Sequence, residues 1–449
     1  MLWRFFGRVL MSCLILPGAG AWASVRTQPA QPDRVEWLRE NGVAVKTLDM
    51  YPKDLSDLMP LKAAIGDAQV VLLGEQSHGD GASFAAKSRL IKFLHQEMSF
   101  DVLAWESGME EMRRCDGAFK EGKPVDDAHG IGLFGIWALS QQCRELLEYV
   151  RKERTGEHPL MMAGFDDQVT TAPSLTPFPK QLIEFFDAAD RKLLSDEQRA
   201  APAKVYAWLD KAGETKAPKL PDELETLRGL VALIDRERAT LELKHGKREV
   251  AFQQRALGNI ISYVERWNAG DDPAFRNHRD QRMADNLVFL ADEYFKGHKI
   301  IVWAASMHNA RHVEPLKWVE APEMNYEGVR PMGDYAFEKL GTRMYSVMLT
   351  AYSGRIGRPW TGAGPVPDAA AGSLEALMHD TGKPYLFVDF RGLPKDHWLR
   401  EPIAARPLGY APMKGVWPDV FDAVMFTDRM YPSTRLGFEP EDARPQQAR

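Results

Sequence analysis

Short, continuous apolar runs recur along the chain, and each is closed by glycine or by polar residues. The clearest is Ala68–Gly74, in which four consecutive apolar residues precede the glycine. Runs of this length are typical of strands that are buried on both faces of a parallel sheet. The other runs that we interpret as strands are 101–105, 160–163, 299–304, 344–350, 385–389 and 421–426.

Helical patterns lie between the early strands. Residues 83–97 and 139–154 have helical periodicity, and the second places Leu146, Leu147 and Val150 on one face. A further amphipathic segment, 54–66, precedes the first strand and ends at a glycine. Strands that alternate with helices form βαβ units. The pattern therefore predicts an α/β fold with a mostly parallel central β-sheet flanked by helices.

Residues 175–270 differ from the rest of the chain because they are highly charged and favour helix. We interpret them as a charged helical insertion between strands 3 and 4 of the predicted sheet, placed as a cap over the active site. The α/β domain as a whole is predicted to span residues 54–430. Residues 431–449 are rich in proline and charge and are predicted to be a flexible tail.

The N-terminus has the pattern of a secretory signal peptide. Arg4 and Arg8 form a positively charged segment before a short apolar core, Val9–Leu16. Ala21-Trp22-Ala23 then matches a cleavage site. This predicts a signal peptide at 1–23, a leader at 24–53 and a periplasmic or secreted protein. The alternative is a retained anchor, but the core is shorter than the roughly 20 residues that span a bilayer. We therefore expect no stable membrane insertion after signal cleavage.

Charge and cysteine content narrow the class of protein. The formal net charge is −6 and no basic stripe occurs, so we expect no nucleic-acid partner. The chain has three cysteines, of which Cys13 would leave with the signal peptide. Cys115 and Cys143 remain, and their spacing leaves open whether they form a disulfide.

Ionisable side chains follow four of the predicted strands. Ligands of open α/β sheets bind beyond the carboxyl ends of the strands, so we expect these side chains to converge. Within this set, His78 is the candidate general base and Glu75 the carboxylate that orients its ring. The alternative is that the carboxylates accept backbone amides at helix N-termini. The set consists of Glu75, His78, Glu106, Asp166 and His308.

Several common chemistries have no motif in the chain. The sequence contains no G-x-S-x-G nucleophile elbow, no H-E-x-x-H zinc motif and no P-loop. His308 and His312 have helical i, i+4 spacing, which leaves a metal site open as the alternative. A histidine base with carboxylates and no protein nucleophile indicates direct attack by an activated water.

Several separate motifs, in order, resemble the erythromycin esterase family. The first is Val70–Gly79, followed by a helix and by Ala104–Ser107. The resemblance covers roughly residues 55–428. The later motifs are Gly132–Trp137, Ala163–Asp166, His278–Asn286, Ile300–Ala304, His308–Arg311 and Phe421–Phe426.

The resemblance implies hydrolysis of a macrocyclic lactone or another small-molecule ester, with no cofactor, no metal and no covalent intermediate. It implies that His78 is the general base and that Glu75 and Glu106 orient it or the water. Lys87, nine residues after His78, then becomes a candidate to stabilise the oxyanion. Arg279 and His308 match further active-site positions. We assign Asp166, Phe165 and Trp137 to substrate binding.

Two positions depart from the family pattern. Many members have a second histidine where this chain has Ala305, and many have Thr-x-Glu where it has Asp80-Gly81-Ala82. The first departure removes an imidazole and bears on whether macrolides are substrates. Two alternatives therefore stay open: a periplasmic metal- or haem-binding protein, or metal-dependent hydrolase, on the same fold, and a scaffold without catalysis. The oligomeric state is not predicted.

Overall fold

The computed structural model describes residues 31–51, 54–212, 219–267, 273–321 and 323–438. They form two compact units. Unit 1 contains Trp105–Phe134 and Met162–Gly297, and unit 2 contains 31–104, Gly135–Met161 and 298–438. The predicted signal peptide lies outside the described residues. The predicted leader is described only from residue 31, where it contains the helix α2 (Pro32–Asn41) that the sequence analysis missed.

Unit 2 is built on a mixed sheet. Its strands follow the order β1-β9-β12-β7-β2-β5, and β8 pairs with β7. The neighbours β12, β7, β2 and β5 are parallel, whereas β9, β1 and β8 are antiparallel to their partners. The strands are β1 (Val43–Ala44), β2 (Val70–Glu75), β5 (Ile300–Ala305), β7 (Met344–Ile356), β8 (Gly364–Val366), β9 (Tyr385–Asp389) and β12 (Ala423–Met430).

All seven predicted strands are present, including β3 (Val102–Gly108) and β4 (Met161–Asp166). The expectation of a mostly parallel sheet was wrong, because the sheet is mixed. An apolar run reports that a strand is buried on both faces and carries no information on direction. Tyr385–Asp389 has such a run, yet it is antiparallel to β12.

Both faces of this sheet are covered. Val424 and Phe426 of β12 belong to a core cluster with α2 and α17 (Leu374–His379), whereas Ala423 and Met425 point to the opposite face and are also buried. Helix α4 (Gly81–Met98) packs against β2, β5, β7 and β12. Burial on both faces explains why these strands have no alternation of apolar and polar residues.

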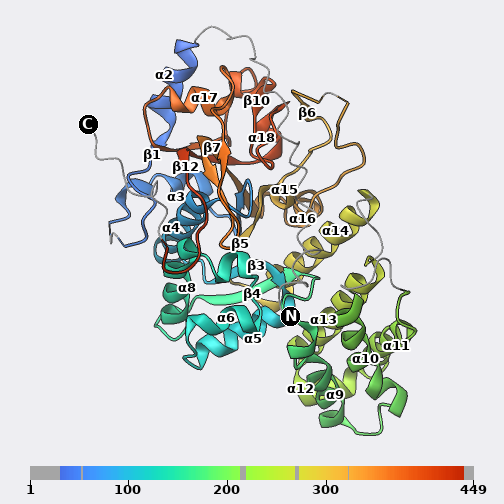
Figure 1. Cartoon of the computed structure of the whole chain (residues 1–449). Helices are drawn as coiled ribbons and strands as arrows, with labels where there is room; N and C mark the ends of the chain where they lie inside the picture. The colour runs from blue at the N-terminus through green and yellow to red at the C-terminus, as the bar shows by residue number, and fades with distance from the viewer. Residues whose placement is uncertain (1–30, 52–53, 213–218, 268–272, 322, 439–449) are drawn as a thin grey trace. The chain divides into compact units, whose positions relative to one another are not determined.

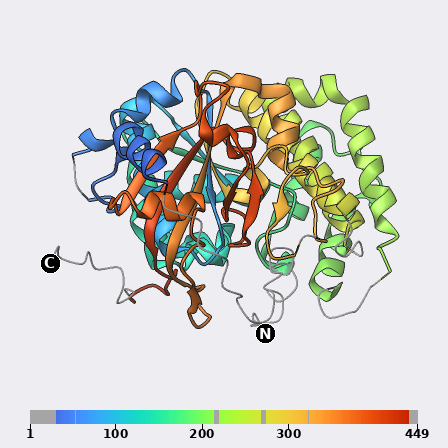
Figure 2. The ribbon, with the colours of Figure 1, turned by 90° about the horizontal axis from the view of Figure 1, so that it is seen from above.

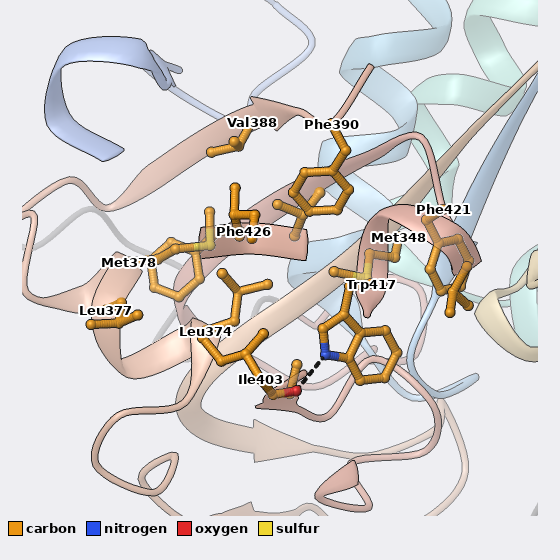
Figure 3. Packing of buried hydrophobic residues seen from close by; sticks show 14 of the residues in the cluster. Met348, Leu374, Leu377, Met378, Val388, Phe390, Ile403, Trp417, Phe421 and Phe426 are labelled. Atoms are coloured by element: carbon orange, nitrogen blue, oxygen red, sulfur yellow. Dashed lines mark hydrogen bonds between the residues drawn. The ribbon is translucent and has the colours of Figure 1, made fainter. Parts of the chain in front are cut away.

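The core cluster of unit 2 continues beyond the main sheet (Figure 3). Trp417 is fully buried there, and its indole Nε1 donates to the Ile403 carbonyl at 3.0 Å. Ile403 lies in a small antiparallel sheet of order β10-β11-β6 that the sequence analysis missed. Its strands are β6 (Lys317–Trp318), β10 (Ile403–Ala405) and β11 (Met413–Gly415).

Unit 1 is mainly helical. The helices of the predicted insertion pack side by side, as α10, α11 and α13 show in Figures 1 and 2. In α11, Leu224, Leu227 and Leu230 are buried at a spacing of three, while Arg228 faces solvent and pairs with Glu225 at 2.6 Å. These helices are α9 (Phe178–Ala189), α10 (Asp196–Ala212), α11 (Glu223–Arg236), α12 (Arg238–His245), α13 (Lys247–Glu265) and α14 (Pro273–Phe289).

The remaining helices connect these elements, and the 83–97 and 139–154 patterns correspond to α4 and α8. No helix in the described part of the chain is long and apolar enough to cross a membrane. Cys115 and Cys143 are both buried free thiols. The helices are α3 (Leu61–Ile65), α5 (Met109–Lys120), α6 (Ala128–Ile131), α7 (Gly135–Ala138), α8 (Gln141–Glu153), α15 (Ser306–Asn309), α16 (Met332–Leu340) and α18 (Trp417–Val420).

Candidate active site

The candidate site of unit 2 begins where β2 ends. The strand is buried throughout and delivers Glu75 at its carboxyl end, opposite Ala305 of the parallel strand β5. Gly74 allows this close packing, because a Cβ there would lie 2.7 Å from the Ser306 Cα. The Ser306 hydroxyl donates to the Gly74 carbonyl at 2.8 Å and ties α15 to the strand end.

Glu75 is the centre of a buried charge cluster. One carboxylate oxygen, Oε1, lies 3.1 Å from Nδ1 of His78, and the other, Oε2, accepts from the Lys87 ammonium. Glu75 and Lys87 are both 0 % exposed and His78 is 8 % exposed. Because an ionised carboxylate only accepts, the proton of this bond belongs to His78 Nδ1. In the neutral ring, Nε2 is then the atom that can take a proton.

Two tryptophans enclose this cluster. The Lys87 ammonium lies 4.0 Å from the centre of the Trp303 ring and donates to the Ala304 carbonyl at 3.2 Å. Trp137 meets the His78 ring edge-on, with the ring centres 5.6 Å apart. A cation over an aromatic face is attracted by the ring electrons, and more strongly when it is desolvated. The two rings therefore hold both partners of Glu75 away from water.

Asp80 fixes the turn that carries His78. Its Oδ2 accepts from the Ser77 amide at 2.9 Å, and its Oδ1 accepts from the Tyr410 hydroxyl at 3.0 Å. Burial raises the pKa of Asp80 to about 8, and the nearby Glu75 carboxylate acts in the same direction. The sequence analysis noted Asp80 only as a departure from the family pattern, because Tyr410 is 330 residues away.

Distant segments hold the rest of the turn. Gln76 donates through its side-chain amide to the Arg406 carbonyl at 2.8 Å. The backbone carbonyl of Gln76 accepts from the Gly409 amide. The Gly79 carbonyl accepts from the amides of Gly357 and Ser433. Ser433 belongs to the predicted tail, in which residues 431–433 contact residues 79–81 and residues 434–437 contact residues 139–142. Residues 439–449 lie outside the described residues. Their loop sequences carry no motif that would have revealed these contacts.

His308 follows β5 in unit 2, on the short helix α15, and is buried. The prediction that His308 and His312 lie on one helix at i, i+4 spacing was wrong. Helix α15 ends at Asn309, and His312 is exposed with a φ of 48°. Across the described ranges, no group of three or more His, Cys, Asp or Glu side chains is arranged to hold a metal ion.

The remaining predicted site residues form a second buried cluster, in unit 1. Arg279 donates through Nε and Nη2 to the two oxygens of Asp166, at 3.2 and 2.6 Å, and through Nη2 to Glu106 at 3.3 Å. Gln168 also donates to Asp166, at 3.2 Å. Burial opposes the charge of Arg279, but Asp166 and Glu106 outweigh it and raise the pKa of the guanidinium.

Phe165 precedes Asp166 in β4 and is fully buried, with its carbonyl accepting from Asn286 at 2.9 Å. After Asp166, Asp167 pairs with Arg266 and accepts from Ser262 at 2.7 Å. Burial raises the pKa of Asp167, but Arg266 and Ser262 outweigh it and the net direction is downward. The sequence analysis missed this pair, although an acidic residue directly after a strand end was the signal used elsewhere.

The structure thus divides the predicted residues between two clusters. In unit 2, Glu75 contacts both His78 and Lys87, and Trp137 packs against the His78 ring. His308 follows the neighbouring strand, β5. Unit 1 contains Glu106, Asp166 and Arg279 in one ion-pair network, with Phe165 beside it.

Comparison with known proteins identifies the family. The erythromycin esterase family model matches residues 95–430, which is most of the chain. The chain belongs to the erythromycin esterase family. The relationship supports a hydrolase, and the α/β fold with a central sheet flanked by helices agrees with it.

Three similar proteins align over 80% or more of this chain. A protein of Bacillus subtilis (strain 168) named "Putative hydrolase YbfO" is 26% identical over 95% of this chain and 97% of its own length. Erythromycin esterase type II of Escherichia coli is 22% identical over 80% of this chain and 90% of its own. A crystal structure of an erythromycin esterase mutant in its open conformation has a TM-score of 0.67 at 14% identity, covering 88% of this chain and 100% of that one.

Proposed function

We propose that this member of the erythromycin esterase family hydrolyses an ester or lactone by attack of a water that His78 activates. The single observation that carries the proposal is the bond between Glu75 Oε1 and His78 Nδ1 at 3.1 Å. A carboxylate in this place selects the ring tautomer with Nε2 unprotonated and stabilises the imidazolium that forms when Nε2 takes a proton. That is the requirement for a general base.

The reaction balances with His78 as the only proton carrier. Nε2 takes a proton from water while the water oxygen forms a bond to the ester carbonyl carbon. The resulting tetrahedral intermediate carries its negative charge on the former carbonyl oxygen. When it collapses, the carbon–oxygen bond to the alcohol breaks, and the imidazolium returns its proton to the departing alkoxide. The products are a carboxylic acid and an alcohol, and His78 is neutral again.

Lys87 takes a different role in this proposal from the one that the resemblance implies. Its ammonium is 0 % exposed and contacts Glu75, the Ala304 carbonyl and the Trp303 ring. A substrate oxygen would have to displace one of these groups to reach it. We infer that Lys87 is a positioning residue, which fixes the Glu75 carboxylate so that its other oxygen meets His78.

The proposal also extends to the class of ester that is the substrate. A macrolide fits the name of the Escherichia coli relative. Ala305, at the end of β5 opposite Glu75, is the position where many family members have a second histidine. A pocket with one imidazole fewer favours a smaller or less demanding ester, so we propose simple esters and lactones as substrates beside macrolides. Roles for Glu106, Arg279, Asp166 and His308 rest on the family resemblance.

A substrate panel tests the proposal. Purified protein is incubated with macrolides, simple lactones and acyclic esters, and the products are analysed by mass spectrometry for the addition of one water. We expect at least one class to be hydrolysed by the native chain, and about 10²–10⁴-fold more slowly by the His78→Gln variant. His379→Gln, at a half-exposed histidine paired with Asp428, is the matched control and retains activity. Hydrolysis by His78→Gln at a rate within a few-fold of the native chain would overturn the role of His78.

Export is a separate proposal that rests on the N-terminal pattern. If the signal is cleaved after Ala23, N-terminal sequencing of protein recovered from outside the cytoplasm gives a chain that begins at Ser24. A chain that retains Met1 in that fraction would contradict cleavage.

A further inference from the structure

A cleft of about 470 Å³ lies in unit 1 among helices α5, α9, α12 and α13. Its volume falls within the range of small-molecule sites. None of the residues that line it belongs to either charge cluster described above. Three helices of the predicted insertion, α9, α12 and α13, thus help to form a cleft that plays no part in the proposed hydrolysis.

Two ion pairs form the frame of this cleft. Arg113 of α5 donates from one nitrogen, Nη1, to both oxygens of Glu249 of α13, each at 2.9 Å. Arg114 donates through Nε to Oε2 of Glu110 at 3.0 Å and through Nη2 to the Ile131 carbonyl at 3.0 Å. Both guanidinium groups are therefore already engaged with protein oxygens. They hold the Glu110 and Glu249 carboxylates in fixed orientations.

Two buried acceptors in the lining have no hydrogen-bond donor among the described residues. They are Glu110 Oε1 and Gln253 Oε1, on side chains that are 5 % and 4 % exposed. The amide of Gln253 cannot simply turn round, because its Nε2 donates to Glu249 at 2.8 Å. A buried acceptor without a donor is unfavourable in free energy, because it has lost its hydrogen bonds to water and gained none in return. A ligand that brings donors to these oxygens would recover that free energy.

The cleft also offers a flat ring surface and more acidic than basic side chains, and burial raises the pKa of one of them, Glu110. The rings of Phe185 and His245 are stacked, with their centres 4.4 Å apart and an interplanar angle of 28°. His245 Nε2 lies 2.8 Å from the Phe185 carbonyl, so Nε2 carries the proton and Nδ1 of the neutral ring is another acceptor. The lining has three carboxylates, those of Glu110, Glu184 and Glu249, against two guanidinium groups.

We propose that this cleft binds a small ligand rich in hydrogen-bond donors that carries a protonated amine on a hydroxylated ring, the chemistry of an amino sugar. The ammonium and hydroxyl groups supply the donors that Glu110 Oε1 and Gln253 Oε1 lack. The positive charge complements the lining carboxylates, and the apolar face of the ring packs beside Phe185 and His245. This site is independent of the proposed hydrolysis and uses none of its residues.

Calorimetric titration of the full chain with glucosamine, at a pH where its amine is protonated, tests the proposal. The matched ligand is N-acetylglucosamine, which keeps the ring and hydroxyl groups but has no positive charge. We expect glucosamine to bind and N-acetylglucosamine to bind at least about 10-fold more weakly. Absence of glucosamine binding, or equal affinity for the two sugars, would overturn the proposal.

Variants locate the binding site. Glu110→Gln replaces an acceptor by a donor and removes a charge, and we expect it to weaken glucosamine binding by about 10-fold or more. Glu121→Gln makes the same change at an exposed position just after α5 and should bind like the native chain. If Glu110→Gln does not fold, the Glu184→Gln variant is used in its place, because Glu184 is an exposed residue of α9 that also lines the cleft. We expect it to weaken glucosamine binding several-fold. Native-like affinity in a folded Glu110→Gln or Glu184→Gln variant would show that this cleft is not the site.

Discussion

The two buried charge clusters use the same kinds of residue in opposite proportions. In unit 2, one carboxylate, Glu75, is shared by His78 and Lys87. In unit 1, one guanidinium, Arg279, is shared by Asp166 and Glu106. The first contains an imidazole, whose ordinary pKa lies close to neutral, whereas the second is held by a guanidinium whose pKa is raised further. The first arrangement is suited to moving a proton and the second to holding a fixed charge.

The largest expected effect breaks the proton-transfer role of the unit 2 cluster. Replacing His78 with Gln keeps a hydrogen-bonding side chain of similar size but removes the basic nitrogen. We expect kcat for any hydrolysed ester to fall by about 10²–10⁴-fold, because general-base catalysis contributes a factor of that order. Steady-state kinetics on a substrate identified by the panel measures it. Turnover within a few-fold of the native value would remove His78 from the mechanism.

The unit 1 cluster is tested by removing the cation that its two carboxylates share. Arg279→Met leaves Asp166 and Glu106 buried without their shared partner, and we expect the free energy of unfolding to fall by about 3–5 kcal/mol. Urea unfolding followed by circular dichroism measures the loss. Arg236→Met, at an exposed arginine paired only with Glu237, is the matched control and should change stability by less than about 1 kcal/mol. Equal small losses in both variants would show that the Arg279 network stabilises nothing.

Stability against pH tests a buried carboxyl beside the unit 2 cluster. Burial raises the pKa of Asp80 to about 8 from its ordinary value of 3.8, so between those pH values the folded chain keeps a proton that the unfolded chain has lost. Stability therefore falls as pH rises through this window, by up to about 1.4 kcal/mol per pH unit.

Asp80→Asn removes this titration and should flatten the fall, so the variant gains on the native chain between pH 5 and pH 8. The melting temperature of both chains across this range measures the difference. Asp67→Asn, at an exposed aspartate of the same unit, should leave the native slope unchanged. Parallel curves for Asp80→Asn and the native chain would mean that Asp80 is ionised throughout.

A smaller effect separates positioning from catalysis within unit 2. Lys87→Met removes a positive charge that shares Glu75 with His78, so the imidazolium becomes easier to form and the pKa of His78 rises. The acid limb of the kcat–pH profile should then move to higher pH by about one unit. A variant that loses activity with an unmoved profile would contradict the coupling through Glu75, and a purely structural role would leave the profile in place.

The elements that the sequence identified correctly share one property. Each predicted strand is a largely apolar run, because every residue of a strand that is buried on both faces contacts the core. The helices of 175–270 were also predicted correctly, because apolar residues recur there every three or four positions. The direction of a strand could not be inferred from its apolar run, and β9 is antiparallel to β12. The small sheet of β6, β10 and β11 was missed because each of its strands has only two or three residues.

By itself, the sequence determined which residues stand at or near the strand ends. Glu75 ends β2 and His78 follows it, Glu106 lies near the end of β3, Asp166 ends β4 and His308 follows β5. Local pattern suffices for this, because a strand end is marked where the apolar run stops. Only the tertiary structure decided which of them touch. It joined Glu75 to Lys87, Glu106 and Asp166 to Arg279, and Asp80 to Tyr410, because long-range packing selects partners whose separation along the chain leaves no local signal.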